Sequence, residues 1–93
     1  METTIRVGAV PQSAGHARRH LAGFARESGL PLDGAVEAII TELVANAVRH
    51  GREPILVHLS YRDGVWRIAV HDGAPEVENV AIDTTRPGEL EGG

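Results

Sequence analysis

The sequence contains no cysteine and no lysine, and only 3% of its residues are aromatic. The absence of cysteine excludes disulfides, thiolate metal sites and cysteine nucleophiles, and it fits a cytoplasmic protein. With so few aromatic rings, valine, leucine, isoleucine and alanine must fill most of the core. No apolar run reaches the roughly 18 residues that a membrane-spanning helix needs. The N-terminal stretch METTIRV has no basic region followed by an apolar one, so the sequence predicts no signal peptide.

What is present suits one small globular domain. The chain has 93 residues, of which 42% are hydrophobic, enough for a single core. The net charge of −4 argues against a nucleic-acid-binding protein, because such proteins usually carry a basic surface. The negative charge gathers in residues 72–93, which contain one basic residue and six acids: Asp72, Glu76, Glu78, Asp83, Glu89 and Glu91.

The first half of the chain predicts a strand followed by a helix. Residues 3–10 alternate between polar and apolar types and end at a proline, which is typical of a strand. Pro11–Gly29 predicts a helix, with Ser13 as its expected cap and the glycine as its stop. Three apolar residues fall at helical spacing on one side and predict its core face: Ala17, Leu21 and Phe24.

A second helix is predicted from Asp33 to about His50. Asp33 suits an N-cap, and Gly51 suits the left-handed position that follows a helix. At about 100° per residue, six apolar residues cluster within about 140° and predict the core face: Val36, Ile39, Ile40, Leu43, Val44 and Ala47.

Residues 54–71 predict a β-hairpin that buries one face. Asp63-Gly64 is typical of a two-residue turn. With that turn in place, seven apolar residues share one face: Ile55, Val57, Leu59, Tyr61, Trp66, Ile68 and Val70. A mixed or antiparallel sheet covered on this face by two helices is a two-layer α/β sandwich. The ordered core is expected over about 3–75. Residues 76–93 are expected to form an acidic, lid-like loop or tail, apart from a short element near Val77–Ile82.

The stretch TELVANAVRHG, residues 41–51, carries a polar stripe on the second predicted helix. Glu42, Asn46 and Arg49 project within about 60° of one another, at the border of the core face. One interpretation is an ordinary solvated helix face. The other is the wall of a cleft. There, an asparagine oxygen suits Mg²⁺, a glutamate suits proton abstraction during phosphoryl transfer, and an arginine suits phosphate oxygens.

TELVANAVRHG resembles the N-box of the GHKL ATPase superfamily, which includes gyrase and the histidine kinases. With AGHARRHLAGFARESGL before it, the chain most resembles the anti-sigma factor serine kinases, the RsbW-like branch, over residues 3 to about 75. The resemblance implies a Bergerat-type ATP-binding fold and a cytoplasmic regulator. Such a regulator acts on a sigma factor or on its antagonist protein, with no role in binding nucleic acid or membranes.

The resemblance also implies roles for individual residues. Asn46 would hold Mg²⁺, and Glu42 would be the catalytic base of a protein-serine kinase. Arg49 would contact phosphate. Asp72 would hydrogen-bond the adenine of ATP, and Gly73 would belong to the nucleotide-binding site beside it.

Two departures from the family pattern bear on these roles. The adenine-side motif D-x-G-x-G reads DGAPE at residues 72–76, so its first glycine is shifted and its second is replaced by Glu76. The glycine-rich G2 box and the strands expected after it are absent through Gly93. The alternatives are a protein-binding module without ATP turnover and a piece of a longer kinase. A sheet without the later strands has an open edge, which predicts a homodimer or strand exchange.

Overall fold

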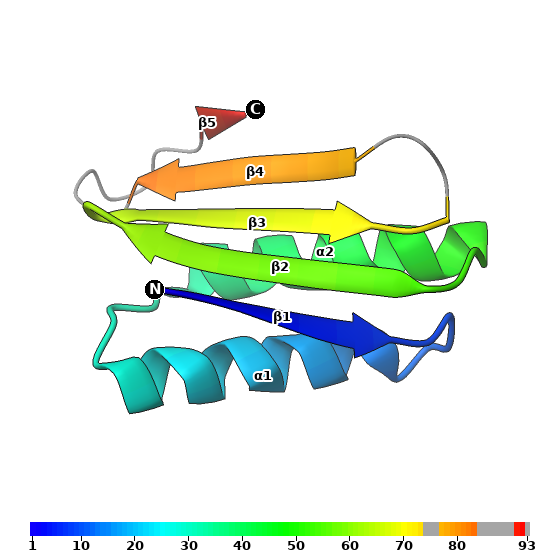
Figure 1. Ribbon diagram of the computed structural model, residues 1–93, viewed down its shortest axis with the longest axis horizontal. Coiled ribbons are helices and arrows are strands. Elements are labelled where there is room, and N and C mark those ends of the chain that lie inside the picture. The colour runs from blue at the N-terminus through cyan, green and yellow to red at the C-terminus, as the bar shows by residue number, and fades with distance from the viewer. Residues whose placement is uncertain (74–76, 84–90, 93) are drawn as a thin grey trace.

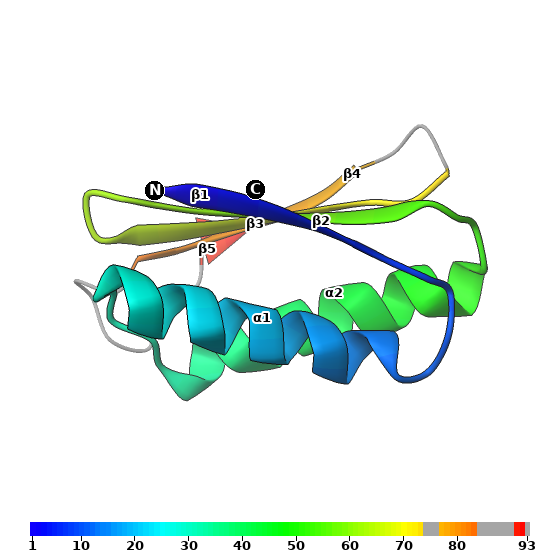
Figure 2. The same ribbon diagram turned by 60° about the horizontal axis from the view of Figure 1, so that its bottom comes forward.

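Two helices lie side by side against one face of a single antiparallel sheet (Figures 1 and 2). The computed structural model describes residues 1–73, 77–83 and 91–92. Its elements in chain order are β1 (Glu2–Val7), α1 (Ser13–Ser28), α2 (Gly34–His50), β2 (Ile55–Arg62), β3 (Val65–His71), β4 (Val77–Asp83) and β5 (Glu91–Gly92). The predicted two-layer α/β arrangement with helices on one face is therefore confirmed.

The sheet has the order β1-β2-β3-β4-β5, and every neighbouring pair is antiparallel. Its centre is the predicted hairpin, in which Arg62 pairs with Val65 across the turn. Asp63 and Gly64 both have positive φ, 52° and 80°, as a turn that matches the twist of the flanking strands requires. The turn therefore fixes the register that places the apolar residues of both strands on one face.

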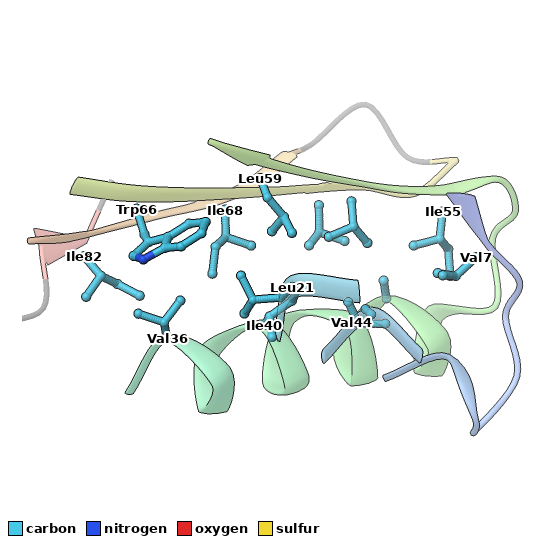
Figure 3. Packing of buried hydrophobic residues seen from close by; sticks show 14 of the residues in the cluster. Val7, Leu21, Val36, Ile40, Val44, Ile55, Leu59, Trp66, Ile68 and Ile82 are labelled. Atoms are coloured by element: carbon cyan, nitrogen blue, oxygen red, sulfur yellow. The ribbon is translucent and has the colours of Figure 1, made fainter. Parts of the chain in front are cut away.

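The core lies between that face of the sheet and the two helices (Figure 3). The face predicted for the hairpin is confirmed, because six of its seven residues are buried and Tyr61 is partly buried. The predicted helix faces also pack here, with Phe24, Ile39 and Leu43 partly buried at the margin. The fully buried large side chains are Trp66, Leu21, Ile40, Ile55, Leu59, Ile68, Val36, Val44 and Val57.

Helix α1 begins two residues later than its sequence predicts. Ser13 is not its cap: Gln12 occupies that position without a capping side-chain bond. Ser13 is instead buried, and its hydroxyl donates to the Gly8 carbonyl at 2.6 Å. The serine therefore ties the start of the helix to the loop that follows β1. The end at Gly29 is as predicted, with φ of 66°.

Both predicted ends of α2 are confirmed. The Asp33 carboxylate accepts hydrogen bonds from the backbone N–H groups of Ala35 and Val36 at 3.0 and 3.2 Å. Gly51 follows the last turn with φ of 68°, and its N–H bonds the carbonyls of Ala47 and Val48. The candidate site residues on this helix are thus held on a helix with defined ends.

Removing the cap of α2 should lower stability without changing the fold. We expect Asp33→Ala to reduce the free energy of unfolding by about 0.5–2 kcal/mol, because two N–H groups lose their acceptor. Asp33→Asn should retain most of the stability, since an amide oxygen can accept the same bonds. Urea denaturation followed by circular dichroism measures both. Equal losses in the two variants would contradict this explanation.

The sheet continues past the hairpin. The short element considered for Val77–Ile82 is strand β4, which pairs with β3 along its length, from Val77 opposite His71 to Asp83 opposite Val65. Ala81 and Ile82 are buried. The element considered near Val77–Ile82 is therefore a strand that extends to Asp83, and β5 pairs with it in turn. Residues 74–76, 84–90 and 93 lie outside the described residues.

Candidate functional site

The polar stripe of α2 consists of residues with different exposure. Glu42 and Arg49 are exposed, whereas Asn46 is partly buried between them. The guanidinium of Arg49 donates from Nη2 to Asn46 Oδ1 at 2.9 Å. The structure therefore joins two of the three predicted stripe residues directly. An exposed hydrogen bond of this kind is weak enough for a ligand to replace it.

Asp72 and His50 form the second contact of the site. Asp72 follows the last residue of β3, and His50 is the last residue of α2. The distance from His50 Nδ1 to Asp72 Oδ2 is 3.2 Å, so a protonated Nδ1 donates to the carboxylate. The Asp72 side chain is only 9% exposed, against 53% for His50. The Asp72 carboxylate is thus largely shielded from solvent, whereas the His50 ring is about half exposed.

This contact fixes which side of α2 the stripe occupies. At about 100° per residue, His50 projects within the core face of α2, in the half of that face nearest the stripe of Glu42, Asn46 and Arg49. Because His50 touches the residue after β3, that flank of the helix lies toward β3 rather than toward α1. Helix α2 also contacts β4, the next strand in the sheet. The stripe and Asp72 therefore belong to the same side of the molecule.

Gly73 has a packing explanation that the sequence did not supply. A Cβ atom placed there would lie 3.2 Å from Cβ of Arg52 and 3.4 Å from the carbonyl oxygen of Glu53. The Gly73 N–H also points to the Arg52 carbonyl, at 3.4 Å. The glycine therefore lets the chain after β3 approach the connection between α2 and β2 closely. This approach places Asp72 within reach of His50.

The stripe offers an oxygen donor to a hard cation such as Mg²⁺, most of whose other ligands would be phosphate oxygens and water. An amide oxygen such as that of Asn46 is a hard donor that suits Mg²⁺, and Mg²⁺ commonly binds one or two protein groups together with phosphates and water. Among the described residues, no group of three or more His, Asp or Glu side chains is arranged to hold a metal ion by itself. A metal ion at Asn46 would therefore need most of its ligands from elsewhere, such as phosphate oxygens or water.

His50 is the functional candidate that sequence reasoning assigned no contact. The sequence pattern places it only at the end of the second predicted helix, and its partner Asp72 is 22 residues away. Other histidines have structural partners. His20 Nε2 lies 3.1 Å from Thr3 Oγ1, and His58 lies between Thr4 and Glu2, at 2.7 and 3.3 Å.

No family model matches the chain, and neither does any curated protein or solved structure. The resemblance of residues 41–51 to an N-box therefore stays a prediction, and function must be argued from the residues themselves. Within residues 1–73, 77–83 and 91–92, neither helix has the run of apolar side chains that crossing a lipid bilayer requires.

Proposed function

We propose that the protein is an ATP-binding regulator of the anti-sigma factor serine-kinase type, with a Bergerat-type fold and a cytoplasmic location. It would act on a sigma factor or on the antagonist of one. The observation that carries the proposal is the His50–Asp72 contact of 3.2 Å, which sets the polar stripe of α2 and a shielded carboxylate on one side of the molecule. Side-chain oxygens on a helix face, with a carboxylate on the same side of the molecule, suit a nucleotide with its metal.

Each residue of the site has a separate part in this proposal. Asn46 would offer its amide oxygen to Mg²⁺ bound to the phosphates, once Arg49 turns from Asn46 Oδ1 toward a phosphate oxygen. Asp72 would accept a hydrogen bond from the adenine amino group. Glu42, exposed one turn before Asn46, would take the proton of the attacking hydroxyl.

Removing the Asn46 amide should weaken Mg-ATP binding by about tenfold or more, because hydrogen bonds and ligands to charged groups contribute roughly 1.5–3 kcal/mol. Isothermal titration calorimetry of the wild type and of Asn46→Ala with Mg-ATP measures the difference. In EDTA the two proteins should bind ATP about equally. The loss is specific to the metal-bound nucleotide, because the amide acts on the metal.

Thr41→Ala is the matched control on the same helix, since its hydroxyl donates to the Glu37 carbonyl at 2.8 Å and lies on the opposite flank. It should bind as the wild type does. A folded wild-type protein that shows no saturation with millimolar Mg-ATP would rule out nucleotide binding. Equal affinity of Asn46→Ala and wild type in Mg²⁺ would remove Asn46 from the site.

A second candidate function is a protein-binding module that does not turn over ATP. The observation in its favour is that Asn46 Oδ1 and the Asp72 carboxylate both contact protein groups, Arg49 and His50. These contacts stabilise α2 and its connection to the sheet without any ligand. Equal capture of a purified sigma factor or antagonist with and without ATP, unchanged by Asn46→Ala, would favour this candidate.

A further inference from the structure

The free side of β1 presents backbone groups that are oriented for another strand. In the described part of the chain, β1 is the outermost strand of the sheet on its side. Met1 and Tyr61 exchange both backbone hydrogen bonds across β1 and β2, at 3.2 and 2.8 Å. Along an antiparallel pair, facing residues alternate between pairs that exchange both backbone hydrogen bonds and pairs whose N–H and C=O groups point away from each other. Glu2, Thr4 and Arg6 therefore direct their N–H and C=O groups away from β2.

A groove runs beside this edge, between β1 and α1. Two cavities form it, of about 390 and 340 Å³, and Arg19 lines both. Helix α1 runs along β1 below the sheet in Figure 2 and contacts it. Val10, a large apolar residue that is 48% exposed, lines one cavity, and partly buried Phe24 lines the other. The groove thus has an apolar side chain in each half.

Gly23 keeps one half of the groove open at a cost to the helix. It lies inside α1, where glycine destabilises a helix by about 1 kcal/mol relative to alanine. A Cβ atom at Gly23 would have nothing within 4 Å, so close packing within the described chain does not require the glycine. The missing side chain leaves space in the wall of the groove, where an added strand would place its own side chains.

The charge of the groove selects its occupant. Arg6, His16 and Arg19 line the larger cavity, which has no acidic lining residue. Glu27 lies in the smaller one, beside Arg19 and His20. Charged side chains on an edge strand commonly prevent association with other strands, but arginines repel basic segments and attract acidic ones.

The geometry points to the β1 edge as a docking site for an extended, acidic segment of a partner protein, which adds to the sheet as a further strand. Its backbone pairs with Glu2, Thr4 and Arg6. Its apolar side chains contact Val10 and Phe24, and its carboxylates lie near Arg6 and Arg19. Main-chain bonds supply affinity and side-chain contacts supply selectivity in this mode of recognition. The site is separate from the proposed nucleotide site on α2 and does not depend on it.

A fluorescein-labelled peptide of alternating valine and aspartate tests the site by fluorescence anisotropy, without nucleotide. We expect saturable binding to the wild type. The lysine version of the peptide and an acidic version with an N-methylated backbone should each bind about tenfold or more weakly. In hydrogen exchange followed by NMR, the peptide should slow the amides of Glu2, Thr4 and Arg6 about tenfold or more.

Two substitutions test the groove itself. Gly23→Gln should weaken peptide binding about tenfold or more by filling the groove, and it should not harm folding because glutamine favours a helix over glycine. Arg19→Glu should weaken binding similarly by reversing a charge. The matched controls are Ala38→Gln, exposed on α2, and Arg26→Glu, exposed on α1 outside both cavities. Both should bind as the wild type does.

Several results would overturn the proposal. They are the absence of saturable binding to the folded wild type, equal binding of the lysine peptide, and full binding by both groove variants. Peptide-induced protection confined to amides of other strands would place the binding elsewhere. If the β1 amides exchanged more slowly at higher protein concentration in the absence of peptide, the edge would be assigned to a second copy of the chain.

Discussion

Trp66→Ala is expected to lower the free energy of unfolding by about 3–5 kcal/mol. Small domains have about 5–15 kcal/mol in total, so this one substitution should remove a large share of the stability. The reason is the position of the single tryptophan in the core (Figure 3). Its side chain is 0% exposed, and alanine would leave a cavity that the surrounding strands and helices cannot close.

Three contacts hold Trp66 in this packing. Its ring meets Phe24 and Tyr61 edge to face, with centroids 6.2 and 5.2 Å away. Its indole N–H donates to the Pro31 carbonyl at 2.8 Å, which ties the loop between the helices to the sheet. Trp66→Phe should therefore cost less, about 1–3 kcal/mol, because a ring remains but the carbonyl loses its donor.

Urea denaturation followed by circular dichroism tests both substitutions, since the fluorescent reporter itself is changed. Leu56→Ala is the control, because Leu56 lies in the adjacent strand but points to the uncovered face and is 37% exposed. It should cost less than about 1 kcal/mol. A Trp66→Ala protein as stable as Leu56→Ala would show that the core does not depend on this ring.

The hairpin and the ends of α2 were predictable because their signals are local. Asp63-Gly64 adopts positive φ through its own chemistry, and the period of two then assigns every side chain of β2 and β3 to a face. Asp33 and Gly51 likewise act on their own helix. Such features need no knowledge of distant contacts, so the sequence was sufficient for them.

The start of α1 and strand β4 depend on contacts that a sequence pattern does not reveal. Ser13 suits a cap by type, but its hydroxyl bonds the Gly8 carbonyl five residues earlier, which a helix pattern does not contain. The β4 sequence VENVAID lies in the acidic end of the chain, where the pattern indicates a short element without specifying a strand. It becomes a strand because β3 offers a free edge and its pairing buries Ile82 beside the core.

The candidate site also has one part that local sequence signals predict and another that depends on contacts between distant residues. The grouping of Glu42, Asn46 and Arg49 follows from helical spacing, which is fixed by the backbone. The His50–Asp72 contact joins residues from different elements and requires Gly73 to fit against Arg52 and Glu53. No periodicity encodes that fit, so the far side of the site could be suggested only by resemblance.

Glu42→Gln should reduce the rate of ADP formation from Mg-ATP by about 100- to 10,000-fold, the range that a general base contributes. Glutamine keeps the shape of the side chain but cannot accept the proton of the attacking water or serine hydroxyl. Affinity for Mg-ATP should change little, because the proposed metal contact belongs to Asn46. The measurement is ADP release at saturating Mg-ATP, with affinity determined by the calorimetric titration.

Glu37→Gln provides the comparison, since it makes the same chemical change in the first turn of α2, away from the stripe. It should keep the wild-type rate. If Glu42→Gln also kept that rate, the proton would be taken by another group, although Asn46 could still bind the metal. A wild type that bound Mg-ATP without forming ADP, even with purified antagonist present, would instead favour the binding module. Glu42 would then be an ordinary exposed residue of the helix, and the stripe would serve nucleotide binding without catalysis.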